Sequence, residues 1–170
     1  DDSDSCIGLD TKVPLGLRPP PPNHLYPCLT QIPHAWLRAA SKGLCTGPHV
    51  DRVYLGAGSE RILTVWMPLM DVPVDKGALC VALGSHASES FERLRKEYGA
   101  VPASREGGRR KYRPNGERDL YEHCDNDDDG IHWLTMDFQM GDIAIFGLDL
   151  LHMTLNNATD RWRISIETRW

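Results

Sequence analysis

The tripeptide His49-Val50-Asp51 and the distant His152 are the residues of this chain best suited to bind a metal ion. Side chains two positions apart on a strand point to the same face, so His49 and Asp51 can share one ion. An H-x-D tripeptide is common by chance, and its ordinary interpretation is a surface histidine near a surface aspartate. Two imidazoles and one carboxylate on one side of an iron leave three positions for a bidentate co-substrate and dioxygen. Together, the three residues predict a mononuclear iron(II) site.

Arg163 follows His152 by eleven positions, across a turn. Its planar guanidinium can make two parallel charge-assisted hydrogen bonds, which suits the remote carboxylate of 2-oxoglutarate. Thr154 lies two residues beyond His152 and on the same side, where its hydroxyl can donate to the same carboxylate. A buried arginine without a counter-charge would cost about 3–5 kcal/mol, and the co-substrate would supply that counter-charge.

Residues 161–170 alternate in character along a predicted strand. The odd-numbered positions are charged or polar, and most of the even-numbered positions are apolar or aromatic. One of the two faces must be buried. Either the polar face is exposed to solvent, or Arg163 and Ser165 face a polar pocket inside a barrel. The alternation itself favours neither arrangement.

Strands dominate the predicted secondary structure. Short runs of β-branched and aromatic residues separated by turn residues predict strands over 61–67, 78–83, 133–138, 143–146 and 161–170. The run that begins at residue 143 continues through apolar residues to His152, which we expect at the end of that strand. Helices are predicted over 31–44, with Gly43 as a left-handed stop, and over 88–98. Many short strands with few helices are typical of a sandwich or small barrel.

The chain length of 170 residues predicts one domain, over 1–170. Within it, residues 1–30 contain a run of four prolines and are expected to be extended, and residues 99–130 show no sustained period and are expected to form a long loop.

Composition excludes several classes of partner. The net charge is −5 and the sequence pI about 5.8, so nucleic acid is not expected to bind. No apolar run approaches the roughly 20 residues that cross a bilayer, so a membrane is not expected either. The five cysteines include no C-x-x-C pair, which favours free thiols and a cytoplasmic or other intracellular reducing compartment.

Two charged segments have weaker functional interpretations. Residues 93–118 carry nine Lys or Arg against three Glu, which indicates a solvated loop or a segment that attracts an anionic substrate such as a carboxylate or a CoA thioester. The acidic run from Asp125 resembles the start of a calcium-binding loop. Its twelfth position is Met136 where such a loop has a bidentate Glu, so a solvated acidic loop is the preferred interpretation.

Three stretches of the chain resemble the phytanoyl-CoA dioxygenase family of iron(II)- and 2-oxoglutarate-dependent oxygenases. They are GPHVD (47–51), TVWMPLMDVPVDKGALCVALGSH (64–86) and WLTMDFQMGDIAIFGLDLLHMTLNNATDRWRISIETRW (133–170). The resemblance implies a mainly β double-stranded β-helix, a jelly-roll or cupin-like barrel with a few flanking helices. It also implies iron ligands at His49, Asp51 and His152, and a co-substrate site at Arg163, Thr154, Trp66 and Thr64.

The activity implied by the resemblance is hydroxylation of a small organic substrate with dioxygen, releasing succinate and CO2. Fe(II) and 2-oxoglutarate are the implied cofactors, and we expect a monomer. Because relatives have a longer helical N-terminal region and continue past the final strand, we expect a fragment or a reduced form. Two alternatives stay open: a non-catalytic jelly-roll binding module or pseudoenzyme, and a zinc hydrolase with the same three ligands, which gives Arg163 no role. Halogenation is disfavoured because Asp51 is not a small residue.

Overall fold

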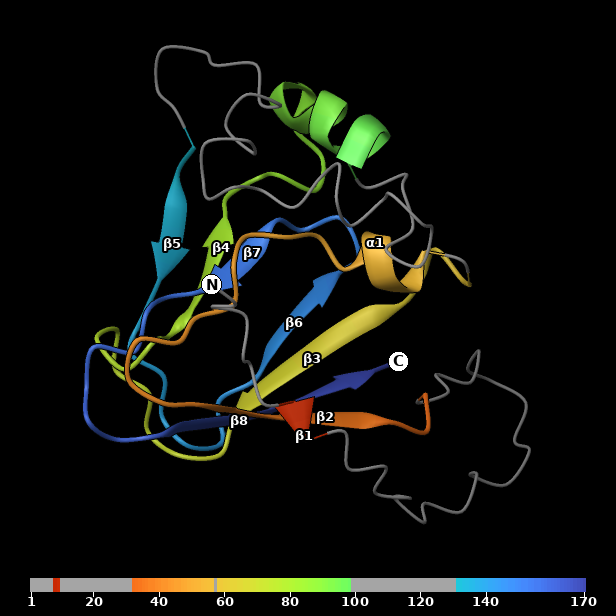
Figure 1. The fold of residues 1–170 in the computed structure, drawn as a ribbon. Coiled ribbons are helices and arrows are strands. Elements are labelled where there is room, and N and C mark those ends of the chain that lie inside the picture. Colours follow the sequence, from red (N-terminus) through yellow and green to blue (C-terminus); the bar gives the residue numbers. More distant parts are fainter. Residues whose placement is uncertain (1–7, 10–31, 57, 99–130) are drawn as a thin grey trace, which may run out of the picture.

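The described strands form two antiparallel sheets (Figure 1). The computed structural model describes residues 8–9, 32–56, 58–98 and 131–170. The larger sheet has the strand order β1 (Gly8–Leu9), β2 (Ala35–Ala40), β8 (Arg163–Arg169), β3 (Leu63–Pro68) and β6 (Ala144–Gly147). The smaller sheet has the order β5 (Trp133–Thr135), β4 (Leu79–Ala82) and β7 (His152–Thr154). β8 therefore lies inside the larger sheet, between β2 and β3.

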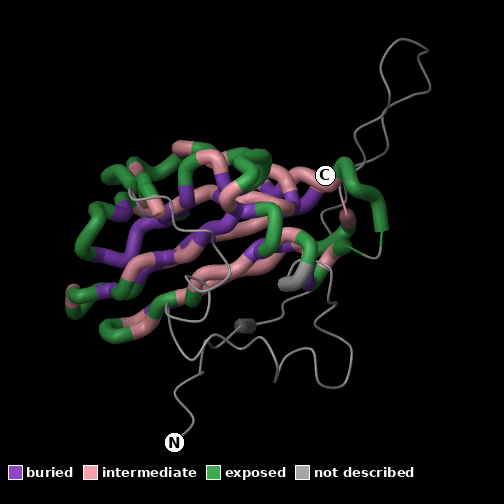
Figure 2. The backbone as a smooth tube through the Cα atoms, turned by 90° about the horizontal axis from the view of Figure 1, so that it is seen from above, coloured by how far each residue is buried: buried purple, intermediate pink, exposed green. Residues whose placement is uncertain are grey.

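Many of the buried residues lie along the strands of the two sheets (Figure 2). Burial alternates along β3, where Thr64, Trp66 and Pro68 are buried and the residues between them are partly exposed. Trp66 on β3 and Phe146 on β6 form a core cluster with Leu79 on β4, so apolar contacts join the larger sheet to the smaller one. This double-layered, mainly β architecture confirms the predicted jelly-roll fold.

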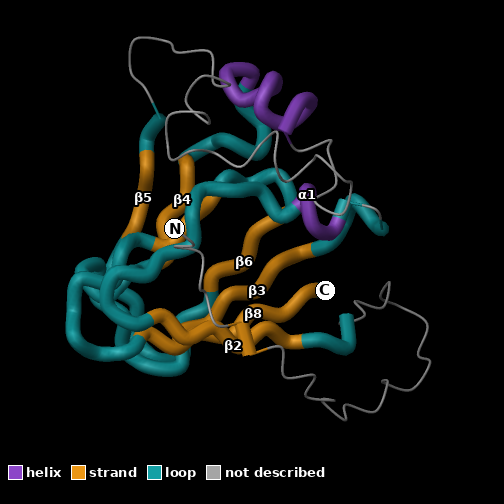
Figure 3. Tube along the Cα trace, viewed as in Figure 1, coloured by secondary structure: helices purple, strands orange, loops and turns teal. Residues whose placement is uncertain are grey.

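Short helical segments lie at one end of the two sheets (Figure 3). They are α1 (Arg52–Leu55), the 3-10 helix η1 (Glu89–Phe91) and the π-helix η2 (Leu94–Tyr98). The last two confirm the helical character predicted for 88–98. Buried apolar residues connect these segments to the sheets and form a second core cluster: Val50, Val53, Ala82, Phe91, Leu94 and Leu151.

The helix predicted over 31–44 is wrong, because residues 35–40 form strand β2. All six residues of β2 pair with β8 in an antiparallel register that runs from Ala35↔Thr168 to Ala40↔Arg163. The Arg38 guanidinium also reaches across to Glu167. Helix propensity is a weak preference. The contacts with β8, a strand distant in the sequence, outweigh the helix propensity of the alanines in β2.

Two local expectations around the histidines also need correction. β6 ends at Gly147, and His152 begins β7 in the other sheet, so His152 does not end the apolar strand. His49 and Asp51 do not lie on a regular strand either. His49 forms an isolated β-bridge with His152, and Asp51 has helical backbone angles and precedes α1. The strand period therefore does not explain why the two side chains converge.

Several predictions concern residues outside the described ranges. They are the extended segment 1–30 apart from β1, the long loop over 99–130 with its acidic run, and most of the basic segment 93–118. Among the described residues, no helix has both the length and the apolar character that would be needed to cross a membrane.

Candidate metal and co-substrate site

Side chains from two distant parts of the sequence, 49–51 and 152, meet between the sheets. One ligand atom each from His49, Asp51 and His152 lies within 4.8 Å of the other two. The Asp51 Oδ1 atom is 3.7 Å from His49 Nε2 and 3.9 Å from His152 Nε2. The structure therefore brings together all three residues predicted as metal ligands. A cluster of two imidazoles and one carboxylate is the donor set that non-heme iron(II) oxygenases use.

Backbone pairing brings the two imidazoles together. The His49 amide donates to the His152 carbonyl at 2.9 Å, and the His152 amide donates to the His49 carbonyl at 3.0 Å. Residues directly opposite each other in an antiparallel pair project their side chains to the same face. The ring centroids are accordingly 4.2 Å apart. Asp51 follows at the start of α1, whose Leu55 amide donates to the Asp51 carbonyl at 3.0 Å.

Hydrogen bonds fix which nitrogen of each imidazole is available to a metal. His49 Nδ1 lies 2.8 Å from the Gly47 carbonyl, and His152 Nδ1 lies 2.9 Å from the Leu150 carbonyl. A carbonyl can only accept, so both Nδ1 atoms carry the proton and donate. Each Nε2 atom then presents a lone pair toward Asp51, which is how histidine ligands are commonly oriented.

Burial keeps both histidines neutral. Burial, together with the neighbouring His152, lowers the pKa of His49 to about 4. The pKa of His152 is also lowered, mainly by burial. Because a metal binds the neutral imidazole, both side chains are in the binding form at neutral pH without losing a proton.

The two oxygens of the Asp51 carboxylate have different surroundings. Oδ1 faces the imidazoles. Oδ2 accepts a hydrogen bond from the Thr64 hydroxyl and forms an ion pair with Arg169 Nη2 at 3.1 Å. Burial alone would raise the pKa of Asp51, but Arg169, the two histidines and Thr64 lower it by more. The carboxylate is therefore ionised in the metal-free protein.

Arg163 and Ser165 face the interior, so the solvent-exposed alternative for the polar side of β8 is wrong. Arg163 is 2% exposed and its Nη2 lies 3.4 Å from Thr154 Oγ1, which also accepts a hydrogen bond from the Thr46 amide at 2.8 Å. Ser165 Oγ and Trp66 Nε1 are buried and have no hydrogen-bond partner among the described residues. Unsatisfied buried polar atoms are costly, so this interior suits a polar ligand.

The family model for phytanoyl-CoA dioxygenase matches residues 24–165, which is most of the chain. The chain belongs to the phytanoyl-CoA dioxygenase family. No curated protein matches it in a sequence comparison. The matched residues include the whole His-Asp-His cluster and Arg163, whereas Arg169 lies just beyond them.

Solved structures show the same fold as this phytanoyl-CoA dioxygenase family member. SnoK, a non-heme alpha-ketoglutarate-dependent carbocyclase from nogalamycin biosynthesis, matches with a TM-score of 0.61 and 20% identity, over 82% of this chain and 48% of SnoK. The epimerase SnoN, solved with Fe3+, alpha-ketoglutarate and nogalamycin RO, matches with a TM-score of 0.53 and 20% identity, over 82% of this chain and 48% of SnoN. The chain thus spans about half the length of these relatives.

Three charged residues near the metal cluster were not predicted from the sequence: Arg169, Glu167 and Arg38. Arg169 pairs with both Asp51 Oδ2 and Glu167 Oε2, each at 3.1 Å, and Arg38 Nε pairs with Glu167 Oε1 at 2.7 Å. The available signal was the alternation along residues 161–170, which places Glu167 and Arg169 on the same polar face as Arg163. Their partners lie far away in the sequence, so the alternation could not identify them.

Proposed function

We propose that this chain is an iron(II)- and 2-oxoglutarate-dependent oxygenase. In this proposal His49, Asp51 and His152 hold the iron, and Arg163 with Thr154 holds the remote carboxylate of 2-oxoglutarate. The observation that carries the proposal is the convergence of two imidazoles and one carboxylate within 4.8 Å, with the buried Arg163 guanidinium at Thr154, two residues beyond His152. The coarser conclusion, membership of an iron- and 2-oxoglutarate-dependent oxygenase family, follows from the match of the family model.

The spacing of the site fits the co-substrate. Thr154 lies two residues from His152 on β7, and both side chains are buried. Two residues of a strand span about 7 Å, which is comparable to the length of a five-carbon keto acid. Its keto-carboxylate end would lie at the cluster and its other carboxylate at Arg163. Trp66 and Thr64 would line the same interior, and Thr64 additionally holds Asp51.

The chain contributes binding and positioning. Iron, when bound, would supply the reaction of dioxygen with 2-oxoglutarate that yields succinate, CO2 and an oxidised substrate. The Gly47 and Leu150 carbonyls keep both Nε2 atoms deprotonated, and Arg163 aligns the co-substrate. The centroid of the buried Phe146 ring lies 4.6 Å from that of the His152 ring, so Phe146 would shield this side of the site from water.

We further propose that the substrate is a small organic molecule and that the reaction is a hydroxylation: one oxygen atom enters a C–H bond of the substrate and the other enters succinate. An anionic or acyl-CoA-like substrate would be consistent with the basic character of residues 93–118. SnoK is a carbocyclase and SnoN is an epimerase, so identification of the product decides between hydroxylation and these reactions.

The decisive experiment is anaerobic addition of Fe(II) and 2-oxoglutarate to the full chain. A weak visible charge-transfer band should appear, and admission of oxygen should release succinate. His152→Ala, which removes one imidazole, should give neither signal. Mass spectrometry of candidate substrates for a gain of one oxygen atom then tests hydroxylation separately. A protein that binds neither iron nor keto acid would be a binding module, and one that prefers zinc and ignores the keto acid would be a hydrolase.

A further inference from the structure

The Asp51 carboxylate is held asymmetrically. Oδ1 is the oxygen nearest to His49 Nε2 and His152 Nε2, at 3.7 and 3.9 Å. Oδ2 points away from the imidazoles toward the larger sheet, where the Thr64 hydroxyl of β3 and the Arg169 guanidinium of β8 both contact it. Asp51 is 3% exposed and Arg169 is 4% exposed, so little solvent competes for these contacts.

Arg169 is itself fixed in place by other side chains. Glu167 accepts from Arg169 Nη2 at 3.1 Å, and the Arg169 guanidinium lies over the Trp36 ring, 5.1 Å from its centroid. Glu167 is in turn held by Arg38 through two contacts at 2.7 and 3.2 Å. The network contains two cations and two anions, so every buried charge in it faces an opposite one.

A carboxylate can bind a metal through one oxygen or through both. The second mode would require Oδ2 to leave Thr64 and Arg169 and to turn toward the imidazoles. It would also occupy one more position on the metal, and an oxygenase of this type needs three positions for its keto acid and dioxygen. Contacts that prevent Asp51 from binding the metal through both oxygens would therefore keep a metal position open for dioxygen.

We propose that Arg169 and Thr64 are positioning residues that restrict Asp51 to a single metal-binding oxygen, Oδ1. The inference rests on the proposed function, because it takes His49, Asp51 and His152 as the ligands. In this role both residues act through Asp51, and neither touches the metal. Thr64 supplies one donor from β3 and Arg169 supplies a charged donor from β8, so two strands of the larger sheet hold the same oxygen.

The test counts the water molecules on bound Mn2+, used alone as a spectroscopic probe. Three protein ligand atoms leave about three water positions on a six-coordinate ion, and a two-oxygen Asp51 leaves about two. Water proton relaxation and the broadening of the Mn2+ electron resonance signal in 17O-water both report this number. The comparison includes wild type, Arg169→Gln, Thr64→Val and Arg161→Gln, each first checked for folding by circular dichroism.

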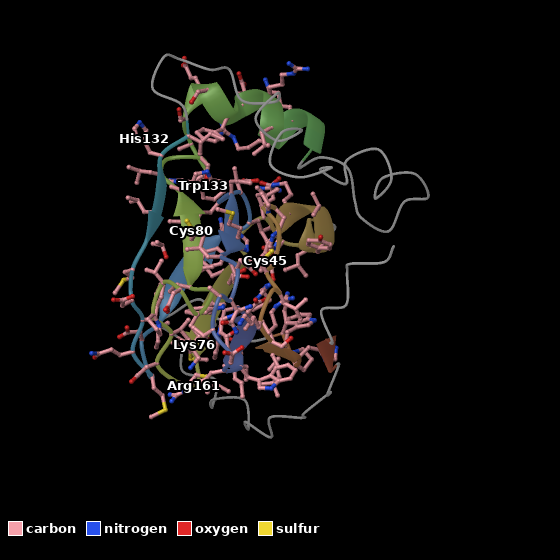
Figure 4. All side chains as sticks on the ribbon, turned by 60° about the vertical axis from the view of Figure 1, so that its left-hand side comes forward. Cys45, Lys76, Cys80, His132, Trp133 and Arg161 are labelled. Carbon is pink, nitrogen blue, oxygen red and sulfur yellow. The ribbon has the colours of Figure 1, made fainter. Side chains whose placement is uncertain are left out.

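Arg161→Gln is the matched control. Arg161 is exposed and lies with Lys76 at one end of the two sheets (Figure 4). It precedes β8, whereas Arg169 ends that strand, so roughly 25 Å of extended chain separates the two residues. The variant loses the same charge and side chain as Arg169→Gln without approaching Asp51.

We expect about three waters in wild type and in Arg161→Gln, and about two in Arg169→Gln and Thr64→Val. Three waters in both site variants would overturn the inference, and so would loss of Mn2+ from both variants in their folded state. If Arg169→Gln does not fold, Thr64→Val decides alone, because it removes one hydroxyl and no charge. Failure of wild type to bind Mn2+ would contradict the proposed function itself.

Discussion

Two buried arginines on the same strand serve different partners. Arg163 reaches Thr154 of the smaller sheet, whereas Arg169, six residues later, pairs with Asp51 and Glu167. A buried charge needs an opposite charge or a polar ligand. Arg169 faces two carboxylates of its own chain, whereas the Arg163 guanidinium lies beside the Thr154 hydroxyl of β7, two residues beyond His152.

Arg163→Gln should weaken 2-oxoglutarate binding by about 10–100-fold, because a hydrogen bond to a charged group contributes about 1.5–3 kcal/mol. Metal affinity should be unchanged, since Arg163 is not among the three ligands. Anaerobic titration of the Fe(II) protein with the keto acid measures the first quantity, and titration with Mn2+ measures the second. Equal keto acid affinity in wild type and variant would remove Arg163 from the co-substrate site.

The low pKa of His49 makes the stability of the metal-free protein depend on pH. In the unfolded chain this pKa is near 6.5, and in the fold it is about 4. Between these values the unfolded chain binds more protons, so the free energy of unfolding should fall as the pH decreases from 6.5 to 4, by on the order of 3 kcal/mol. Urea denaturation at several pH values measures this change in the free energy of unfolding.

The same pH experiment has an internal control. His49→Gln removes the titrating group and should reduce the slope, leaving the contribution of His152, whose pKa is also lowered. A stability that does not change between pH 6.5 and 4 in wild type would contradict the burial of neutral imidazoles.

Among the secondary-structure elements, the sequence predicted best those strands whose residue pattern is local. The strands corresponding to β3, β4 and β8 follow from alternating or β-branched runs, and these were found near the predicted positions. β2 was missed because its composition favours a helix, while its actual conformation depends on pairing with β8. The contact between Arg38 and Glu167 spans 129 positions, and no local pattern contains that information.

The candidate site follows the same rule. The residue types and the family resemblance selected His49, Asp51 and His152, which the structure brings together, and Arg163, which it buries. The reason given for the pairing of His49 with Asp51 was incorrect, because a β-bridge and the start of a helix bring them together. The contact of Arg169 with Asp51 joins two segments that are far apart in the sequence, so no local pattern contains it.

The turn before β4 offers a test of local backbone requirements. Gly77 has a φ of +84°, and a Cβ at this position would lie 2.7 Å from the Leu155 carbonyl oxygen. Gly43 has a nearly identical φ of +83° with no atom within 4 Å of the added Cβ. Gly43→Ala should therefore cost about 1–2 kcal/mol for the left-handed backbone alone, and Gly77→Ala should cost clearly more.

Urea denaturation of the two alanine variants side by side measures this difference in the free energy of unfolding. An equal loss of stability in both variants would show that the backbone around Leu155 moves aside. The close approach at Gly77 would then not contribute to the cost of the substitution.

For the whole molecule, the candidate metal centre connects the two sheets. His152 belongs to the smaller sheet, and Asp51 is held by Thr64 and Arg169 of the larger one. A metal that binds only the folded chain should raise its stability, by about 2.7 kcal/mol at a concentration 100 times the dissociation constant. For a chain of this size that corresponds to an increase in Tm of about 5–11 °C.

Thermal unfolding with Mn2+, and again after excess chelator, measures this stabilisation. His152→Ala lacks one ligand and should show little or no increase. A similar increase in that variant would place the binding of the ion elsewhere on the protein.

The position of β8 has a consequence for biosynthesis. β2 and β3 both pair with β8, yet β8 is the last of the described strands to leave the ribosome. At typical translation speeds the 94 residues between the end of β3 and the start of β8 take roughly 5–20 s to synthesise. During this interval the nascent polypeptide can complete neither its larger sheet nor the contact of Arg169 with Asp51, so this fold must mature late, after β8 has emerged.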